Sequence, residues 1–554
     1  MDYFAVPEMN AKDAELPSQY WIEEWEKEDR PKFWKARRRS ATSESEVCDV
    51  FTKIVHLLNP IDLIKEKYVC PEHPLLPQSE KAWKQTLHAL HRHNNQAYVD
   101  AVANFVLSRF RETNMTPHCV LSYGSMTGIS KSYQYNITPE YDSYRQCRWF
   151  WKGMESYHAF LTVMKGDCSH PDLEEICREL VTCPFEDEEM ITIAPLDGVE
   201  DTTDAESVHS FTFDTIEEDT DNADTIYELH QKVTGLTIGP RSSSSTPSSH
   251  SAHSARSSES SRSESSRSSD SDSGSDSDSS EEVDLDICLT IPNMPVIFIN
   301  QEAQEGVMDD LLDDPLERGS PEWETRWSAW LFQVVAVLTF LQKAICFTHN
   351  DLHSNNIVWR RTDQPFLYYK ERDGTVWKVP TFGKIFSIID FGRSIFRLGR
   401  RLWVSDDHWP DQDAGDQYNF GPFFDHKKAK HPPNPSFDLC RLAVSLMDGM
   451  FDEIPPKKKG KGVSVMSQEG SWKVYETKSP LYNLLWSWMV DDKGCTIYED
   501  EEGNEKYEGF DLYIRIAQDV HGAIPKEQLR RPIFQSFITR DPVDAETMVY
   551  ALGI

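Results

Sequence analysis

The fold is decided by two short stretches of the chain, CFTHNDLHSNNI at Cys346–Ile357 and IIDFG at Ile388–Gly392. In the first, the spacing H-x-D-x-x-x-x-N can place a carboxylate beside a reacting hydroxyl and, five residues later, an amide on a metal ion. In the second, an apolar strand ends in an aspartate that can bind a metal, followed by a glycine that lets the chain turn sharply.

Together the two stretches predict a site for phosphoryl transfer from ATP with Mg²⁺. Asp351 would accept or orient the proton of the attacking hydroxyl, and Asn356 and Asp390 would hold the metal ion that bridges the nucleotide phosphates. Either spacing occurs by chance, but two such elements in this order, each beside a strand or helix of the right kind, rarely coincide.

On these residues the chain resembles the protein-kinase superfamily, over Pro295–Met450 and over Val47–Tyr123. More narrowly, it resembles haspin-like kinases and the divergent kinases of large DNA viruses. This likeness rests on Asp351-Leu352-His353, where His replaces the usual Lys, and on the long connector from Asn356 to Asp390. The connector contains a predicted hairpin that turns at Asp373-Gly374. The resemblance implies an α+β, bilobal fold with a strand-rich N-lobe and a mainly helical C-lobe.

The resemblance also implies roles for further residues. His353 stands where a lysine normally contacts the γ-phosphate, and a neutral imidazole lacks that fixed charge, so we expect slower turnover or a dependence on histidine protonation. Asp438 falls where family members place a buried aspartate that accepts hydrogen bonds from the catalytic-loop backbone; an ordinary helix N-cap is the alternative. The segment after the strand at 295–299 looks like the adenine-binding hinge, with Gln301, Glu302 and Gln304 as candidate residues.

The amino-terminal part departs from the kinase pattern. No glycine precedes Gly124, so the Gly-rich loop that normally covers the phosphates is absent, and the small residues at Ser40–Ser43 are a candidate substitute. Lys53, at the end of a predicted strand at 47–55, fits the phosphate-binding lysine, although an exposed strand lysine would look the same. Asp100, on the predicted helix 97–110, is the best candidate for its acidic partner.

Composition predicts how the chain is organised. Residues 1–46 are expected to form a polar arm, 47–300 the N-lobe and 301–554 the C-lobe. The N-lobe is interrupted by an acidic, Ser-rich insert at 185–286, which holds 26 acidic and 5 basic residues. Such a composition cannot bury enough apolar area to offset the entropy of ordering, so the insert is predicted to be disordered.

Charge and cysteine usage narrow the possible partners and location. The chain has 57 Lys+Arg against 92 Asp+Glu, a net charge of −35, which disfavours binding to nucleic acid or to an anionic membrane. Eleven scattered cysteines without a CxxC pair, and no signal peptide, favour an intracellular location, cytoplasmic or nuclear. Polar residues interrupt the apolar stretch Trp327–Phe347, so we interpret it as a core helix and not a membrane span.

Three functions are compatible with these observations, and a serine/threonine protein kinase is the leading one. Its protein substrate would be basic if the acidic segment 393–437 lines the site, although a solvated acidic loop explains those residues equally well. A small-molecule phosphotransferase of the aminoglycoside- or choline-kinase kind is the second. The third is a pseudokinase scaffold, favoured by the missing Gly-rich loop and opposed by retention of the base and both metal ligands.

Overall fold

The structure is a computed structural model with a mixed α+β fold. It describes residues 20–40, 44–68, 80–165, 173–185, 285–313, 316–410, 412–458, 463–467, 470–474, 476–500, 505–507 and 509–553. The predicted disordered insert at 185–286 therefore lies almost entirely outside the described residues.

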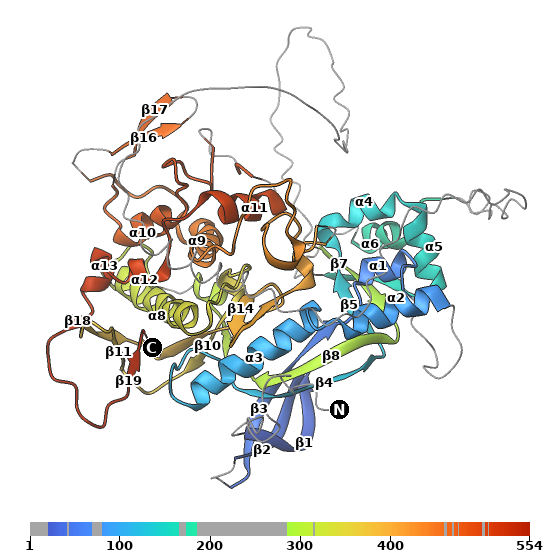
Figure 1. Ribbon diagram of the computed structural model, residues 1–554, viewed down its shortest axis with the longest axis horizontal. Helices are drawn as coiled ribbons and strands as arrows, with labels where there is room; N and C mark the ends of the chain where they lie inside the picture. Colours follow the sequence, from blue (N-terminus) through green and yellow to red (C-terminus); the bar gives the residue numbers. More distant parts are fainter. Residues whose placement is uncertain are drawn as a thin grey trace, which may run out of the picture.

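A five-stranded antiparallel sheet forms the amino-terminal part of the fold (Figure 1). Its order is β1-β2-β3-β8-β4. The strands are β1 (Tyr20–Arg30), β2 (Phe33–Ser40), β3 (Glu46–His56), β4 (Ser122–Ser130) and β8 (Met294–Glu302). The predicted strands at 47–55 and 295–299 are thus present and longer than expected. β4 continues through Gly124, whose positive φ lies at an irregularity of the β4–β8 register.

The expectation of a polar arm over 1–46 is wrong for its described part, because residues 20–40 form the β1–β2 hairpin. Ion pairs along this hairpin include Arg37–Glu26 at 2.9 Å and Arg39–Glu23 at 3.3 Å. Opposite charges facing each other across two strands stabilise their pairing, although exposed pairs contribute only about 0.2–1 kcal/mol each. Since most side chains of β1 are exposed, the hairpin has little of the apolar alternation by which a strand is recognised.

Helix α3 (Gln96–Glu112) lies across this sheet, close to the bounds predicted from its apolar spacing (Figure 1). The side chain of Asn95 caps it by accepting the N–H of Ala97. One face of the helix packs against β3 and β8, and another joins the main core through Val99, Ala103 and Leu107. The helix is therefore held between the sheet and the carboxyl-terminal part of the chain.

A second small body interrupts the chain between β4 and β8, at the right of Figure 1. It contains a three-stranded sheet of order β5-β7-β6 and its own hydrophobic core. Its elements are β5 (Tyr133–Asn136), α4 (Tyr141–Arg145), α5 (Arg148–Ser156), β6 (Phe160–Lys165), α6 (Leu173–Val181) and β7 (Leu285–Ile291), and α1 (Pro60–Ile64) packs on α5. Helix α2 (Glu80–His91) precedes α3. The insertion into the amino-terminal part was predicted to begin at residue 185, but it begins earlier, directly after β4.

Helix α8 (Pro321–Ile345) forms the centre of the carboxyl-terminal part. Among the described helices it alone is long and apolar enough to cross a membrane, yet 89% of its apolar window is buried inside the protein. Ser320 caps its first turn by accepting the N–H of Trp323, and the fully buried Trp327 and Trp330 pack edge to face at 5.3 Å. This confirms the interpretation of the stretch as a core helix.

Strands and helices surround α8. Three sheets have the orders β13-β10-β9, β18-β12-β11-β19 and β14-β15. Their strands are β9 (Gly306–Val307), β10 (Ile357–Arg361), β11 (Phe366–Lys370), β12 (Val376–Pro380), β13 (Lys384–Ile388), β14 (Ile395–Leu398), β15 (Arg401–Val404), β18 (Ile538–Thr539) and β19 (Val549–Ala551). The predicted hairpin is β11–β12, and it turns at Gly374 with positive φ. This part is therefore richer in strands than expected.

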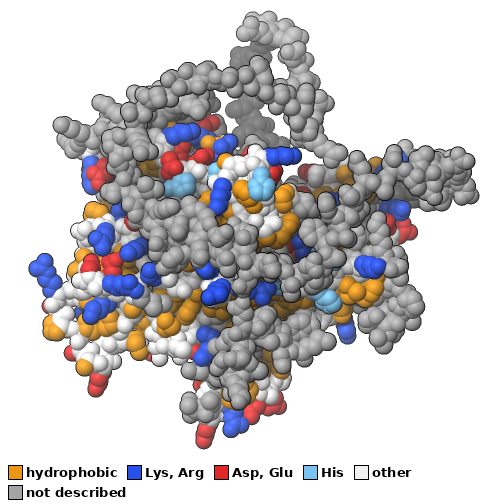
Figure 2. Space-filling model, in the orientation of Figure 1, with side chains coloured by type: hydrophobic (Ala, Val, Ile, Leu, Met, Phe, Trp, Pro, Cys, Tyr) orange, Lys and Arg blue, Asp and Glu red, His pale blue; other side chains and the backbone are white. Residues whose placement is uncertain are grey.

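The remaining elements complete the carboxyl-terminal part. They are α9 (Phe437–Met450), β16 (Val463–Ser467), β17 (Gly470–Val474), α10 (Pro480–Trp488), α11 (Phe510–Asp519), α12 (Pro525–Gln528) and α13 (Pro532–Gln535). A 3₁₀ turn, Asp309–Leu311, follows β9. On the described surface in Figure 2, acidic and basic side chains are interspersed, and no single sign of charge covers this face.

Candidate functional site

The pairing of β10 with β13 brings Asn356 and Asp390 together. Ile357 faces Ile388 in the antiparallel register, so the residues just outside this pair lie at the same end of the hairpin. The N–H of Ile389 donates to the carbonyl oxygen of Asn356 at 3.0 Å. Asp390 follows with a φ of 66°, which turns the chain away from the strand. The two predicted metal ligands are thus neighbours although 34 residues separate them in the sequence.

Asp438 holds the loop that carries Asp351. This carboxylate is completely buried in the first turn of α9 and accepts the backbone N–H groups of His349 and Asn350, each at 3.0 Å. Ser436, at the N-cap position of α9, makes no side-chain cap bond. The expected contact with the catalytic-loop backbone is therefore present, and the N-cap alternative is not. Burial raises the pKa of Asp438, and the two N–H donors oppose that rise.

The side chain of Asn356 closes the loop on itself. Its Nδ2 donates to the carbonyl oxygen of Asp351 at 2.9 Å, so Oδ1 is the atom of this amide that a cation would need. Asp351 itself is partly exposed, with Arg393 Nη1 3.9 Å from its Oδ2. Asn356 and Asp390 supply oxygen donors at the start and end of one hairpin, which is the ligand chemistry that Mg²⁺ takes with phosphates. These residues therefore fit Mg²⁺.

Lys53 joins three separated segments of the chain. Its Nζ lies 2.5 Å from Oδ2 of Asp100 on α3 and 2.8 Å from Oδ1 of Asp390. The other oxygen of Asp100 accepts the N–H of Phe391 at 3.1 Å. Asp100 is 1% exposed, so its side chain faces the site and not solvent. The structure thus places Lys53, Asp100 and Asp390 in one cluster.

Burial and the ammonium of Lys53 act against each other on the two carboxylates. Burial raises the pKa of Asp390, but Lys53 outweighs it and holds the pKa at about 2. Burial likewise raises the pKa of Asp100, and Lys53 only partly opposes this. Lys53 loses solvation too, yet the two carboxylates raise its pKa well above the ordinary value. Lys53 and Asp390 are therefore ionised at neutral pH.

Phe391 anchors the turn after Asp390 in the core. The ring is 2% exposed and lies 5.8 Å from His349 and 6.1 Å from Phe347. Nε2 of His349 makes a hydrogen bond with the carbonyl oxygen of Ile389 at 2.8 Å. This aromatic cluster connects the turn that carries Asp390 to the loop that carries Asp351. It therefore helps to fix the positions of the two carboxylates relative to each other.

The side chains of the three hinge candidates make hydrogen bonds and ion pairs within the protein. Gln301 accepts the Nδ2 of Asn104 at 2.6 Å, and Glu302 forms an ion pair with Arg111, with Nη2 3.0 Å from Oε1. Gln304 donates to the carboxylate of Glu302 at 3.0 Å. Gln301 and Glu302 end β8 and their side chains contact Asn104 and Arg111 of α3, whereas Gln304 lies between β8 and β9.

His353 lies half-buried in the same loop. Burial lowers its pKa below the ordinary value of 6.5, and the Asp351 carboxylate opposes this shift. The imidazole is therefore neutral at pH 7, and it becomes charged only at a pH lower than that of a free histidine.

If phosphate transfer occurs here, His353 should impose a pH dependence on it. The ratio of wild-type turnover to that of His353→Gln should stay constant from about pH 7 to about 8.5 and rise up to about tenfold as pH falls below about 6, because an imidazolium adds positive charge beside the phosphates. Taking the ratio cancels the pH effects that the two proteins share. A ratio that stays level down to about pH 5.5 would contradict this prediction.

The acidic segment 393–437 is mostly occupied by internal contacts. Asp407 is 7% exposed and lies 2.8 Å from Nε of Arg393, while Asp406 accepts the backbone N–H of Gln96 at 2.9 Å. Asp416 pairs with Lys428 at 2.5 Å, and Asp411 lies outside the described residues. The expectation that these carboxylates form an open rim for a basic substrate is therefore wrong for Asp406 and Asp407, which tie the segment to the rest of the fold.

Of the candidate substitute for the Gly-rich loop at Ser40–Ser43, residues 41–43 lie outside the described residues. Ser40 ends β2, and because Arg38 pairs with Glu46 and Phe33 with Phe51, this end of β2 lies away from Lys53. The β1–β2 turn at Pro31-Lys32 lies at the Lys53 end, where the Lys32 carbonyl oxygen accepts the N–H of Thr52 at 2.8 Å. A hairpin turn without glycine thus stands next to Lys53.

Sequence reasoning missed three residues that surround Asp351. Tyr513 of α11 donates its hydroxyl to Oδ1 of Asp351 at 2.7 Å, and Arg441 Nε donates to that hydroxyl at 3.0 Å. Arg393, just after Gly392, bridges Asp351 and Asp407. The position of Arg393 next to the IIDFG stretch was a usable signal, whereas no local pattern marks Tyr513 or Arg441.

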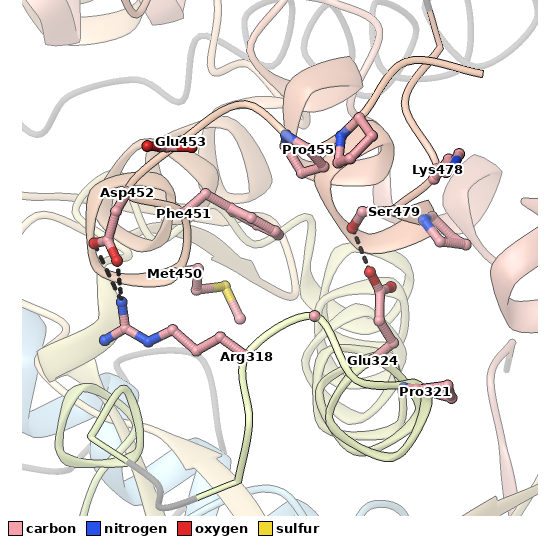
Figure 3. A pocket seen from close by; sticks show the side chains of 13 residues that line it. Arg318, Pro321, Glu324, Met450, Phe451, Asp452, Glu453, Pro455, Lys478 and Ser479 are labelled. Carbon is pink, nitrogen blue, oxygen red and sulfur yellow. Dashed lines mark hydrogen bonds and ion pairs between the residues drawn. The ribbon is translucent and has the colours of Figure 1, made fainter. Parts of the chain in front are cut away.

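A cavity of about 790 Å³ lies apart from these residues, where the start of α8 meets the end of α9 and the start of α10 (Figure 3). Arg318 and Asp452 form an ion pair at 3.3 Å on its wall, and Glu324 binds the hydroxyl of Ser479 and the N–H of Leu481. Figure 3 marks the Arg318–Asp452 and Glu324–Ser479 contacts, and the cavity contains none of the predicted site residues.

Comparison with known proteins adds no relative. No protein-family model matches the chain, and no curated protein matches it significantly.

Proposed function

We propose that the protein is an ATP- and Mg²⁺-dependent phosphotransferase, a divergent serine/threonine protein kinase with a bilobal kinase fold. The proposal is carried by the position of Lys53, whose Nζ lies 2.5 Å from Asp100 and 2.8 Å from Asp390. In protein kinases a lysine on the third strand, its acidic partner on the following helix and the metal-binding aspartate must all be in place. β3, α3 and the IIDFG stretch supply these three groups here.

Two further contacts support the same proposal. Asn356 and Asp390 are neighbours across the β10–β13 hairpin, and Asp438 holds the backbone of the loop between His349 and Asp351. The five-stranded sheet with α3 would be the N-lobe that the resemblance implies, and the part that contains α8 to α11 would be the C-lobe. The protein-kinase alternative is favoured over a small-molecule kinase by the β11–β12 hairpin and by Asp438.

Each residue then has a defined role in the transfer. Lys53 would position the α- and β-phosphates, and Asp390 with the Asn356 Oδ1 would hold Mg²⁺. The metal, when bound, neutralises charge on the transferring group. Asp351 would accept the proton of the serine or threonine hydroxyl as its oxygen bonds to the γ-phosphorus and ADP departs. Neutral His353 would donate one hydrogen bond where a lysine usually provides a charge.

Label transfer from γ-labelled ATP tests this function. With a mixture of serine- and threonine-containing peptides and Mg²⁺, we expect label on peptide hydroxyls, mapped by mass spectrometry, and its loss when excess EDTA removes the metal. Choline and aminoglycosides should remain unlabelled under the same conditions. Labelling of the small alcohols alone would favour the small-molecule class, and Mg²⁺-dependent ATP binding without any transfer would favour a scaffold.

A further inference from the structure

Asp351 already has a hydroxyl group bound to it. The Oη of Tyr513 donates to Oδ1 of Asp351 at 2.7 Å, a hydrogen bond of normal length for a hydroxyl and a carboxylate. Burial raises the pKa of Tyr513, so this hydroxyl keeps its proton at neutral pH. The contact is the one that a substrate hydroxyl must make if Asp351 is the base of the proposed reaction.

Other side chains hold Tyr513 in this orientation. Arg441 Nε donates to its oxygen at 3.0 Å, and the guanidinium lies 5.2 Å from the ring centroid. Because the oxygen accepts from Arg441, its own proton is left to point at Asp351. The ring stacks on Phe510 at 5.2 Å and lies 5.9 Å from Phe437. The hydroxyl is thus positioned by its neighbours and is not in chance contact.

The second oxygen of Asp351 lies near a cation of the same chain. Nη1 of Arg393 lies 3.9 Å from Oδ2, and the Arg393 guanidinium lies 5.9 Å from the Tyr513 ring and 5.8 Å from that of Phe510. The Asp351 side chain is 27% exposed, so the carboxylate is not closed off from solvent. Its Oδ1 is nevertheless occupied, and a substrate hydroxyl that bonds to Oδ1 must displace the Tyr513 hydroxyl by a movement of that side chain.

Helix α11 has features that allow such a movement. It spans only ten residues, and its buried residues are Leu512, Ile516 and Ala517. Gly509, with a φ of 56°, forms the turn directly before it. Ile514 and Gln518 line a cavity of about 300 Å³ that lies between the helix and the segment 408–431. A short helix beside such a space can shift by a rotamer change or a small tilt.

We propose that α11 gates the acceptor side of the site, with the Tyr513 hydroxyl occupying the place of the substrate hydroxyl on Asp351. The inference rests on the proposed function and extends it, because it states what a protein substrate must displace. Substrates would then be protein segments that can compete with α11 as well as present a serine or threonine. The bound hydroxyl lowers the apparent affinity for the acceptor without being part of the transfer step.

Tyr513→Phe tests the gate, because it keeps the ring and removes only the hydroxyl. A hydrogen bond to a charged group is worth enough that its loss should lower the half-saturating concentration of the peptide mixture about tenfold, with turnover at saturation changed less than about twofold. Tyr507→Phe is the matched control, because the Tyr507 ring packs under Arg515 of α11. This substitution should change neither the half-saturating concentration nor the turnover. If Tyr513 instead positions Asp351, turnover will fall and the half-saturating concentration will not, which would overturn the proposal.

Hydrogen exchange separates failure of the gate from failure of the proposed function. In nucleotide-free protein, Tyr513→Phe and Asp351→Ala should each speed amide exchange in 510–519, and the double variant should exchange no faster than either one, because both remove the same contact. Additive effects would overturn the gate even in an active enzyme. If the exchange effects are non-additive but wild type and variants transfer no phosphate, the proposed phosphotransferase function is wrong, and the gate that rests on it is wrong too.

Discussion

Asp351→Asn should lower phosphate transfer about 10³-fold while the protein stays folded and binds Mg²⁺–ATP as before. The amide cannot take up a proton, so the attacking hydroxyl loses its acceptor. An asparagine has nearly the same shape, and its Oδ1 can still accept the Tyr513 hydroxyl that lies 2.7 Å from Asp351. The Lys53 cluster is unchanged because Asp351 is not one of its members.

The measurement compares initial rates of label transfer with the affinity for Mg²⁺–ATP in wild type and variant. Asp452→Asn is the matched control, because Asp452 lies at the remote cavity and pairs with Arg318. It should transfer phosphate at the wild-type rate. Equal rates in Asp351→Asn and wild type would remove Asp351 from the mechanism.

The same pair of measurements separates an enzyme from a scaffold. A scaffold that binds nucleotide needs Lys53 and Asp390 but gains nothing from Asp351, so its properties would not respond to Asp351→Asn. The support around Asp351 costs free energy, because Asp438 is a buried carboxylate that holds the loop backbone in place. Such a cost is hard to explain for a loop without a catalytic role. We therefore expect Asp351 to matter for transfer and not for binding.

The local spacing of residues predicted most of the candidate site. Asp351, Asn356 and Asp390 were recognised because each belongs to a short pattern whose chemistry requires that spacing. Lys53 and Asp100 follow from a different kind of signal, because the resemblance to protein kinases implies a lysine at the end of a strand and an acidic partner on the next long helix. The structure joins the two groups at one ammonium, 2.5 Å from Asp100 and 2.8 Å from Asp390.

The parts that could not be predicted depend on contacts between distant segments. Most side chains of β1 are exposed, so no regular apolar alternation marks the β1–β2 hairpin, and its contacts, such as Trp25–Trp34 and Arg37–Glu26, form only when the two strands pair. Tyr513 reaches Asp351 across 162 residues, and only the packing of α11 beside α9 brings them together. The sequence around Asp407 suggests an exposed charge, but the side chain is buried in an ion pair with Arg393.

Lys53→Met should abolish transfer and also destabilise the protein at neutral pH. The ammonium is the shared partner of Asp100 and Asp390, and Asp100 is 1% exposed. Removing one partner of a buried ion pair typically costs about 3–5 kcal/mol because the remaining charge is left uncompensated. Two carboxylates would then face each other without a cation, so the pKa of at least one should rise above its unfolded value.

This gives the stability defect a definite pH dependence. An acid whose pKa is higher in the folded than in the unfolded state binds more protons when folded, so the free energy of unfolding increases as pH falls through that interval. In the wild type, Lys53 holds the pKa of Asp390 at about 2, so that contribution has the opposite sign and is lost as pH falls below the ordinary aspartate value. The gap between wild type and Lys53→Met should therefore narrow from about pH 7.5 to about pH 5.

Denaturant unfolding at the two pH values measures this gap. Lys35→Met is the matched control, because Lys35 also lies on the sheet and pairs with an aspartate, Asp49, but both side chains are exposed. Its unfolding midpoint should stay close to that of the wild type at either pH, since solvent screens such a pair. A Lys53→Met defect of the same size at both pH values would mean that the ammonium does not hold the pKa values of the two carboxylates down.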